Sequence, residues 1–590
     1  MNTDKELNGA QIVLEALKEQ EVDTIFGYPG GAVLPIYDAI FGQNFLKHVL
    51  VRAEAGAVHA AEGYARSSGE VGVLLVTSGP GATNVVTGLT DALMDSIPIV
   101  CITGQVPTHL IGTDAFQECD TTGITRPCTK YNYLVKDISK LSEIIHEAFE
   151  IARSGRPGPV LIDIPKNIQL QKTIYKSRKD INFKPHRIKS GSTDISKDFI
   201  ESLISHIKSS TKPVLYVGGG CLNSGLKASE ELIKFAELTN IPVTTTLHGL
   251  GCYPGNGKLS IGMLGMHGTY EANLAMHNCD LMINVGARFD DRITGRLDAF
   301  SPNSTKFHFD IDKSSINKNV NVDFSTNTDI AHALSALNLY IESNNIEFNH
   351  NQISNWWGQI KEWQNTNCLN YEQGDEIIKP QHAIARLNEL TKNRETIVTT
   401  EVGQHQMWAA QYFQFNKPNS WITSGGLGTM GFGMPAAIGA QMANPDALVI
   451  DIAGEASFLM NIQEIATAVQ YKLPVKIFIL NNEYMGMVRQ WQELMHGSRY
   501  SESYVDALPD FVKLAESFHA VGLRAKNLSE LDDTISEMMT INRPVIADIW
   551  VDKKENVFPM IPSGAAHNEM LLSKYDKEKP ENQEKGKVLV

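Results

Sequence analysis

The chain has 590 residues, of which 42% are hydrophobic and 20% are charged, and its formal net charge is −15. At roughly 150 residues per domain, this length predicts three or four domains with sizeable cores, and the negative charge argues against general binding to nucleic-acid phosphates. The seven cysteines form no CxxC pair, so neither a disulfide framework nor a zinc ribbon is predicted, and a reducing compartment is expected.

The N-terminal segment "MNTDKELNGAQIVLEAL" contains acidic residues and soon reaches a helical pattern. Transit peptides are rich in arginine and poor in acids, so we predict neither a transit peptide nor a signal peptide here. No apolar run approaches the roughly 18 residues that a membrane-spanning helix needs. We therefore expect no membrane association.

Short runs rich in valine and isoleucine alternate with longer amphipathic stretches along most of the chain. Each strand-like run ends in Gly, Ser, Asn or Asp before the next helical pattern, which is typical of βαβ units and parallel sheets. The sequence therefore predicts an α/β fold. The strand-like segments are 71–84, 98–104, 158–165, 212–220, 281–290, 447–454 and 475–482.

Two polar, irregular segments, 166–194 and 344–380, interrupt this alternation and indicate domain boundaries. The motifs "TSGPGATN" (77–84) and "TSGGLGTMGFGMP" (423–435) open similar units, so related sheets are expected on either side of a middle one. The predicted parts are a first domain at 1–170, a central domain at 190–345, a third domain at 376–551, and a charged tail at 552–590 that is mobile at its end.

In the third domain, "DIAGEASF" (451–458) places a lone carboxylate directly after a strand-like run. The pattern predicts a strand at 447–452, a helix at 458–471, and a strand at 474–480 that lies parallel to the first and beside it. Glu455 and Asn482 would then meet at the edge of the sheet where ligands bind. Their oxygens suit Mg²⁺, with the backbone amides of the turn facing a diphosphate at the helix N-terminus. The alternative is a helix start at which Glu455 only favours the helix dipole.

Motifs along nearly the whole chain, from "FGYPGGAVLPIYDAI" (26–40) to "FPMIPSGA" (558–565), resemble those of the catalytic large subunits of the acetohydroxyacid (acetolactate) synthase family. They include "TSGPGATN", "IGTDAFQE", "SGRPGPVLIDIPK", "GARFDDRITG", "EVGQHQMWAAQ" and "GMVRQWQ", in the family's order. The family uses thiamine diphosphate, and "GEAS…LNN" is similar to its metal motif. The resemblance implies three doubly wound parallel-sheet domains that bind the pyrimidine ring, FAD and the diphosphate, in that order, plus a C-terminal tail.

The resemblance also implies which residues hold thiamine diphosphate and Mg²⁺. Glu54 matches the glutamate that hydrogen-bonds the aminopyrimidine ring, and Met430 matches the bulky residue that bends the cofactor. Glu455, Asn482 and the backbone carbonyl of Tyr484 are the implied Mg²⁺ ligands. The other implied thiamine diphosphate residues are Pro29, Val402, Gly403, Gln404, His405, Gly428, Gly454, Ala456, Ser457, Met485, Gly486, Met487 and Val488.

Segments of the central domain match the FAD-binding segments of the biosynthetic enzymes in this family, in which the flavin has a structural and not a redox role. The triple glycine at 218–220 suits close approach to a cofactor. The implied FAD residues are Arg156, Gly218, Gly219, Gly220, Thr246, Leu247, Leu264, Gly265, Met266, His267, Gly286, Ala287, Arg288, Asp290, Arg292, Asp310 and Ile311.

The implied reaction joins two pyruvate molecules into 2-acetolactate with loss of CO₂, or pyruvate and 2-ketobutyrate into 2-aceto-2-hydroxybutyrate. It is the first common step of valine, leucine and isoleucine biosynthesis. Trp491 matches the tryptophan that favours 2-ketobutyrate as second substrate, where one methylene is worth about 1–3 kcal/mol. The implied catalytic residues are Glu54, Gly31, Gln117 and Lys166, and the implied substrate pocket adds Phe116, Arg292, Met487 and Trp491.

In the family, Glu54 and the diphosphate site belong to different subunits. The resemblance therefore implies a homodimer with the active site at its interface, or a dimer of dimers, and a separate regulatory small subunit. It is compatible with the cytoplasm of a bacterium or with the stroma of a plastid that encodes the protein.

The chain departs from the family pattern at three places. "RAEA" (52–55) replaces Arg-His-Glu-Gln, "LNNEY" (480–484) varies at a backbone ligand, and Glu455 replaces aspartate. Because Mg²⁺ needs near-octahedral geometry at about 2.0–2.1 Å, we expect Glu455 to weaken cofactor binding or to favour larger ions such as Mn²⁺ or Ca²⁺. Two alternatives stay open: a non-catalytic family member, and another enzyme of the same fold such as a pyruvate oxidase or a glyoxylate carboligase.

Overall fold

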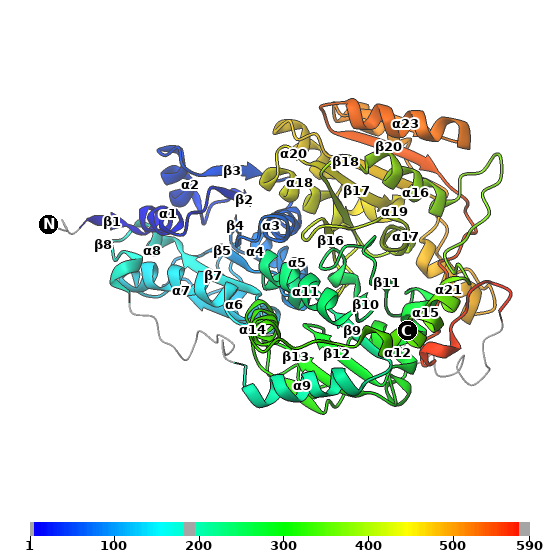
Figure 1. The fold of residues 1–590 in the computed structure, drawn as a ribbon. Helices are drawn as coiled ribbons and strands as arrows, with labels where there is room; N and C mark the ends of the chain where they lie inside the picture. The colour runs from blue at the N-terminus through cyan, green and yellow to red at the C-terminus, as the bar shows by residue number, and fades with distance from the viewer. Residues whose placement is uncertain (1–4, 182–194, 577–590) are drawn as a thin grey trace.

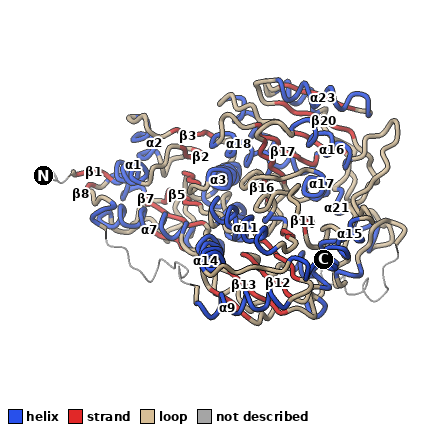
Figure 2. The backbone as a smooth tube through the Cα atoms, viewed as in Figure 1, coloured by secondary structure: helices blue, strands red, loops and turns tan. Residues whose placement is uncertain are grey.

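The computed structural model describes residues 5–181 and 195–576 (Figure 1). The far end of the predicted tail and part of the predicted linker at 166–194 lie outside the described residues. Three six-stranded parallel sheets are each flanked by helices (Figure 2), and a small antiparallel pair joins β1 (Glu6–Asn8) to β8 (Lys172–Ile174). The predicted α/β fold with three doubly wound parallel sheets is confirmed.

In each six-stranded sheet, the order of the strands from edge to edge differs from their order along the chain. Across the first sheet lie β3 (Lys47–Leu50), β2 (Thr24–Tyr28), β4 (Gly72–Val76), β5 (Ile99–Gln105), β7 (Pro159–Pro165) and β6 (Tyr131–Leu134). Across the central sheet lie β11 (Ser260–Met263), β10 (Val243–Thr245), β9 (Pro213–Val217), β12 (Leu281–Val285), β13 (Thr305–Phe309) and β14 (Phe324–Thr326). Across the third sheet lie β16 (Trp421–Thr423), β15 (Thr396–Thr400), β17 (Leu448–Gly454), β18 (Lys476–Asn481), β20 (Val545–Trp550) and β19 (Val521–Ala525).

The first and third sheets have the same strand order, in which the second strand lies outside the first and the last two strands are exchanged. This shared order confirms the relation that the repeated "TSG" motifs predict. The central sheet differs, because its strands follow the order 3-2-1-4-5-6 that is typical of dinucleotide-binding domains.

Helices cover both faces of these sheets. The main ones are α1 (Gly9–Glu19), α2 (Leu34–Phe41), α3 (Glu54–Ser68), α5 (Val86–Asp95), α7 (Leu141–Arg153), α9 (Lys197–Ser209), α11 (Leu226–Thr239), α12 (Tyr270–Asn278), α14 (Ile330–Ser343), α15 (Ser354–Gln364), α16 (Pro380–Thr391), α17 (Gln404–Tyr412), α18 (Gly433–Ala443), α21 (Gly486–Met495) and α23 (Leu528–Thr540). Helix α1 shows the local logic: Asn8 and Gln11 form a capping box, and Ile12, Val13 and Leu17 recur on its buried face.

Helices α3 and α18 join the first and third domains through small residues (Figure 1). A Cβ built at Gly439 would lie 1.8 Å from the backbone oxygen of Ala60, and one built at Gly63 would lie 2.1 Å from that of Ala436. No side chain larger than hydrogen fits at either contact. The two helices therefore approach closely, and their alanines belong to one hydrophobic core shared by both domains.

The helix predicted at 458–471 is broken in the structure. A four-residue helix, α19 (Glu455–Phe458), is followed by a 3₁₀ segment at Leu459–Glu464 and then by α20 (Ile465–Gln470). Asn461 has non-helical dihedral angles, and its Nδ2 donates to the backbone oxygen of Gly431 at 2.7 Å. The apolar period of this segment is real, but a polar contact to a distant loop interrupts the helix.

The first part of the predicted tail packs against the rest of the molecule. Val557, Met560 and Ala565 are fully buried, and His567 Nε2 donates to the backbone oxygen of Ile293 at 2.7 Å. In the part of the chain that the structure describes, no helix combines the length and the apolar character needed to cross a lipid bilayer.

Candidate active site

Each of the three sheets has a point at which the strand order reverses. It lies between β2 and β4 in the first sheet, between β9 and β12 in the central sheet, and between β15 and β17 in the third. Ligands of open α/β sheets bind beyond the carboxyl ends of the strands at such points. The implied cofactor residues follow these strand ends in all three domains.

At the carboxyl edge of the first sheet, Glu54 is the first residue of α3. Its Oε2 accepts a hydrogen bond from Asn84 Nδ2 at 3.0 Å, and a Cβ built at Gly81 would lie 3.4 Å from its Oε1. Pro29 and Gly31 follow β2 at the same edge and are exposed. The carboxylate is thus held by one amide and still open to a further partner.

The start of α3 is capped from another domain. Ala53 offers no capping side chain, and the N–H groups of Arg52 and Ala53 both donate to Glu464 Oε1, at 2.9 and 3.0 Å. Glu464 therefore satisfies the N–H of the N-cap residue Ala53, which the helix start leaves free, and that of the preceding Arg52. The "RAEA" departure leaves the helix start that carries Glu54 well anchored.

The other residues implied for the first domain lie at the same sheet edge. Gln117 has a left-handed backbone (φ 59°), and a Cβ built at Gly79 would lie 2.8 Å from its backbone oxygen. Phe116 is 88% exposed, and Lys166 begins the short helix α8 (Lys166–Leu170) that follows β7. These residues form an open surface and not an enclosed pocket.

In the third domain, β17 and β18 are parallel neighbours, with Gly454 opposite Leu480, as predicted. Glu455 is 1% exposed, and its Oε1 has no hydrogen-bond partner. Burial raises the pKa of Glu455 to about 8, although backbone amides including those of Asn482 and Tyr484 act in the opposite direction. The buried Asn482 accepts from Tyr484 N at 3.1 Å through Oδ1. An unpartnered carboxylate oxygen beside an amide oxygen fits a hard cation such as Mg²⁺.

Beneath these loops lie two buried polar residues: Glu401, which is not among the implied site residues, and His405, which is. Glu401 accepts from Ser457 Oγ at 2.5 Å and from Gly433 N at 2.9 Å, and burial raises its pKa to about 7. Burial lowers the pKa of His405 to about 3, so its ring is neutral at physiological pH. Gly433 and Ser457 are distant from Glu401 in the sequence, so their contacts with it are visible only in the fold.

A cavity of about 480 Å³ lies between the central and third domains and is lined by residues from all three domains. Most of the implied FAD residues line it, together with Val402, Gly403, Gly428, Met487 and Trp491. The FAD residues that line it are Arg156, Gly218, Gly219, Gly220, Thr246, Leu247, Leu264, Met266, His267, Gly286, Ala287, Arg288, Asp290, Arg292, Asp310 and Ile311. The volume, the dinucleotide strand order and the arginines at the wall fit a flavin dinucleotide.

Gly265 is not among the residues that line this cavity, and backbone packing accounts for two of the three consecutive glycines. A Cβ built at Gly218 would lie 2.5 Å from the backbone oxygen of Gly286, and one at Gly220 would lie 2.8 Å from the same atom. Gly286 itself has a left-handed backbone (φ 68°). These glycines are needed where the two strand ends meet, before any ligand is considered.

The implied active site is divided between two surfaces. Pro29, Gly31, Glu54, Phe116, Gln117 and Lys166 lie at the edge of the first sheet, and none of them lines the cavity that contains Met487 and Trp491. Sequence reasoning also missed Asp95 and His248, which do line the cavity. They carry no motif, and only the packing of the three domains brings them together.

Comparisons with known proteins agree with this geometry. Models of the thiamine pyrophosphate enzymes match the chain as the N-terminal TPP binding domain at 7–124, the central domain at 200–337 and the C-terminal TPP binding domain at 401–549. The acetolactate synthase isozyme 3 large subunit of Escherichia coli (strain K12) is 46% identical over 97% of this chain and 99% of its own length.

Two further relatives also match nearly the whole of this chain. The acetolactate synthase large subunit of Haemophilus influenzae is 45% identical over 97% of this chain and 100% of its own length. The chloroplastic acetolactate synthase of Arabidopsis thaliana is 45% identical over 96% of this chain and 85% of its own length. These similarities do not favour a pyruvate oxidase or a glyoxylate carboligase. The chain therefore belongs to the acetolactate synthase large-subunit family of the thiamine pyrophosphate enzymes.

Proposed function

We propose that the protein is an acetolactate synthase that condenses two pyruvate molecules into 2-acetolactate and CO₂, and accepts 2-ketobutyrate as an alternative second substrate. The observation that carries the proposal is the buried, unpartnered Glu455 Oε1 beside Asn482, at the carboxyl edge of the third sheet. The full-length similarity to acetolactate synthases supports the choice of reaction.

Three cofactors are proposed. Thiamine diphosphate would be held by the loops after β15, β16, β17 and β18, with Mg²⁺ on Glu455, Asn482 and the carbonyl of Tyr484. FAD would occupy the cavity at the central domain. When bound, thiamine diphosphate supplies an electron sink for the carbanion left by loss of CO₂.

The chain's own residues would bind, orient and move protons. Glu54, open on one side and held by Asn84 on the other, would hydrogen-bond the pyrimidine ring and hold the proton that the ring exchanges. Gln117, Lys166 and Gly31 would line the approach of the keto acid. Across the site, Trp491 would contact the ethyl group of 2-ketobutyrate.

A homodimer is proposed because the implied site residues lie on two separate surfaces of one chain. The edge that carries Glu54 is open, and the cavity that carries Met487 and Trp491 lies elsewhere in the same chain. A second copy would bring one edge onto the other, as a two-fold interface requires. A dimer of dimers, a regulatory small subunit, and a location in a bacterial cytoplasm or a plastid stroma are further proposals that rest on the family.

The test is an assay of the purified protein with pyruvate, thiamine diphosphate, Mg²⁺ and FAD. Acetolactate should form, one CO₂ should be released for each acetolactate, and the flavin should stay oxidised throughout. Flavin reduction by pyruvate without acetolactate would indicate oxidase chemistry instead. Absence of product with all cofactors bound would contradict the proposed function.

A further inference from the structure

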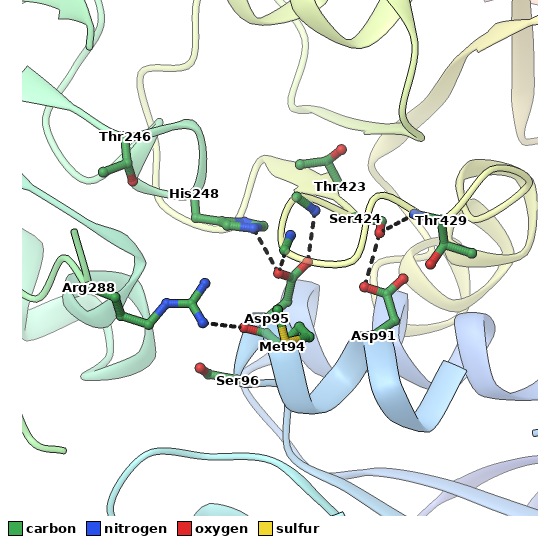
Figure 3. A network of polar contacts seen from close by, with 12 residues as sticks. Asp91, Met94, Asp95, Ser96, Thr246, His248, Arg288, Thr423, Ser424 and Thr429 are labelled. Atoms are coloured by element: carbon green, nitrogen blue, oxygen red, sulfur yellow. Dashed lines mark hydrogen bonds and ion pairs between the residues drawn. The ribbon is translucent and has the colours of Figure 1, made fainter. Parts of the chain in front are cut away.

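Helix α5 ends where all three domains meet, and its last two turns carry two buried acids, Asp91 and Asp95 (Figure 3). The Asp95 carboxylate accepts three hydrogen bonds: Oδ1 from His248 Nε2 at 3.1 Å and from Gly426 N at 2.7 Å, and Oδ2 from Gly425 N at 2.9 Å. Its side chain is fully buried. One carboxylate thus joins the first domain to a loop of the central domain and to a loop of the third.

Asp91, one turn earlier, extends the same arrangement. Its Oδ1 accepts from Ser424 Oγ at 3.0 Å, and that hydroxyl in turn accepts from Thr429 N at 2.7 Å (Figure 3). The two acids therefore hold both ends of the 424–429 segment. This segment leads directly into Met430, the residue implied to bend thiamine diphosphate.

The hydrogen atoms at His248 are fixed by its partners. Arg66 Nη1 lies 3.4 Å from His248 Nδ1, and a guanidinium can only donate, so Nδ1 accepts. Nε2 then carries the hydrogen that is donated to Asp95. Burial acts to raise the pKa of Asp95, but the hydrogen bond from His248, the charge of Arg66 and the Gly425 amide outweigh it and keep that pKa below its usual range. Asp95 is therefore a charged acceptor at neutral pH.

The packing around Asp95 leaves little room for adjustment. A Cβ built at Gly425 would lie 2.3 Å from His248 Nε2, and one built at Gly426 would lie 2.5 Å from Asp95 Oδ1. Thr246, His248, Gly425 and Gly426 all line the cavity. A shift of His248 towards or away from a bound nucleotide must therefore move the loop that leads to Met430.

We propose that Asp95 is a positioning residue that couples the FAD cavity to the thiamine diphosphate loop, so that each cofactor strengthens binding of the other. This inference rests on the proposed function, because it takes the two cofactors from there. It gives the flavin a task other than electron transfer: FAD fixes His248, and through Asp95 it fixes the 425–430 loop. Coupling of this kind is reciprocal by thermodynamic necessity.

The test is a set of four binding measurements on cofactor-free protein with Mg²⁺ present. Thiamine diphosphate is titrated by calorimetry with and without saturating FAD, and FAD is titrated by flavin fluorescence with and without saturating thiamine diphosphate. In the wild type, each cofactor should tighten the other by the same factor, at least about fivefold. In Asp95→Asn, the factor should fall close to one.

Three further variants separate coupling from folding. His248→Ala removes one donor but leaves Asp95 bonded to Gly425 and Gly426, and it should also abolish the coupling factor, whereas His248→Gln keeps a donor and should retain part of it. Asp298→Asn removes an exposed carboxylate of the central domain and should leave the factor unchanged. A coupling factor that survives in both Asp95→Asn and His248→Ala overturns the inference alone. A wild type that binds neither cofactor overturns the proposed function, and the inference with it.

Discussion

At the scale of a single residue, the side-chain length of Glu455 should set the metal preference of the site. Its carboxylate is buried with one free oxygen, and the small, strictly octahedral Mg²⁺ tolerates a displaced ligand less well than a larger ion. We expect the wild type to need more Mg²⁺ than Glu455→Asp for half-maximal thiamine diphosphate binding. With Mn²⁺ the difference should shrink. Titrations of thiamine diphosphate at fixed metal, followed by tryptophan fluorescence, measure both.

Two further variants test that prediction, one at Glu455 itself and one at a neighbouring acid. Glu455→Gln keeps the size of the side chain but removes its charge. It should weaken binding of the metal and the cofactor by at least about tenfold, which corresponds to about 1.4 kcal/mol of binding free energy. Glu483→Asp shortens a neighbouring acid that is paired with Lys553 and should change nothing. Equal requirements for Mg²⁺ in the wild type and in Glu455→Asp would show that the turn absorbs the extra methylene.

At the scale of elements, the contact between two strand ends depends on the absence of side chains. One is the junction of β9 with α10 (Gly219–Asn223), and the other is the junction of β12 with the turn that follows it. A Cβ at Gly220 would lie 2.8 Å from the backbone oxygen of Gly286 and 2.9 Å from its Cα. Because both are backbone atoms, Gly220→Ala should lower the free energy of unfolding by about 1–3 kcal/mol and should weaken FAD binding. Urea unfolding and flavin fluorescence test the two effects.

The matched control for that substitution is Gly358→Ala in α15. A Cβ at Gly358 meets no atom within 4 Å, and alanine is the better helix former by about 1 kcal/mol. This variant should be unchanged or slightly more stable. Equal destabilisation in the two variants would contradict the role assigned to the contact with Gly286.

Other elements show which features of the fold and the site can be predicted from sequence and which cannot. Glu455 and Asn482 could be placed together because strand adjacency in a βαβ unit follows from local pattern and handedness. The break at Asn461 could not, because it depends on a hydrogen bond to Gly431 in a separate loop. Asp95 and His248 were missed for the same reason: 153 residues separate them in the chain, and only domain packing joins them.

At the scale of the whole molecule, buried histidines should make the protein sensitive to acid. Burial lowers the pKa of His567 and of His267 to about 4 each, so between pH 6.5 and 4 the unfolded chain binds protons that the folded chain does not. Their contribution to stability is therefore complete above pH 6.5 and is lost as the pH falls. Asp163 acts in the opposite direction, because burial raises its pKa to about 7. The change in the free energy of unfolding with pH is therefore the difference between these opposing contributions.

A single variant isolates one of these groups. His567→Gln can still donate to the backbone oxygen of Ile293 but cannot take up a proton. Its free energy of unfolding should fall less steeply than that of the wild type as the pH drops from 6.5 to 4.5, by up to about 1.4 kcal/mol per pH unit. Urea unfolding at several pH values gives the two slopes, and parallel slopes would contradict the buried, neutral state of His567.

The division of the site between two surfaces gives a test of the whole assembly. If one site takes Glu54 from one subunit and Asn482 from its partner, Glu54→Gln and Asn482→Ala chains should each be inactive alone. Each mixed dimer should contain one doubly damaged site and one intact site. Random mixing makes half of the dimers mixed, so about one quarter of wild-type activity should return.

Glu54→Gln mixed with Lys166→Ala is the control, because both residues lie at the edge of the first sheet. Every site then keeps one defect, and no activity should return. No recovery in the first mixture would mean that the active site is built within a single chain, and recovery in the control would mean that Glu54 and Lys166 of one site come from different chains.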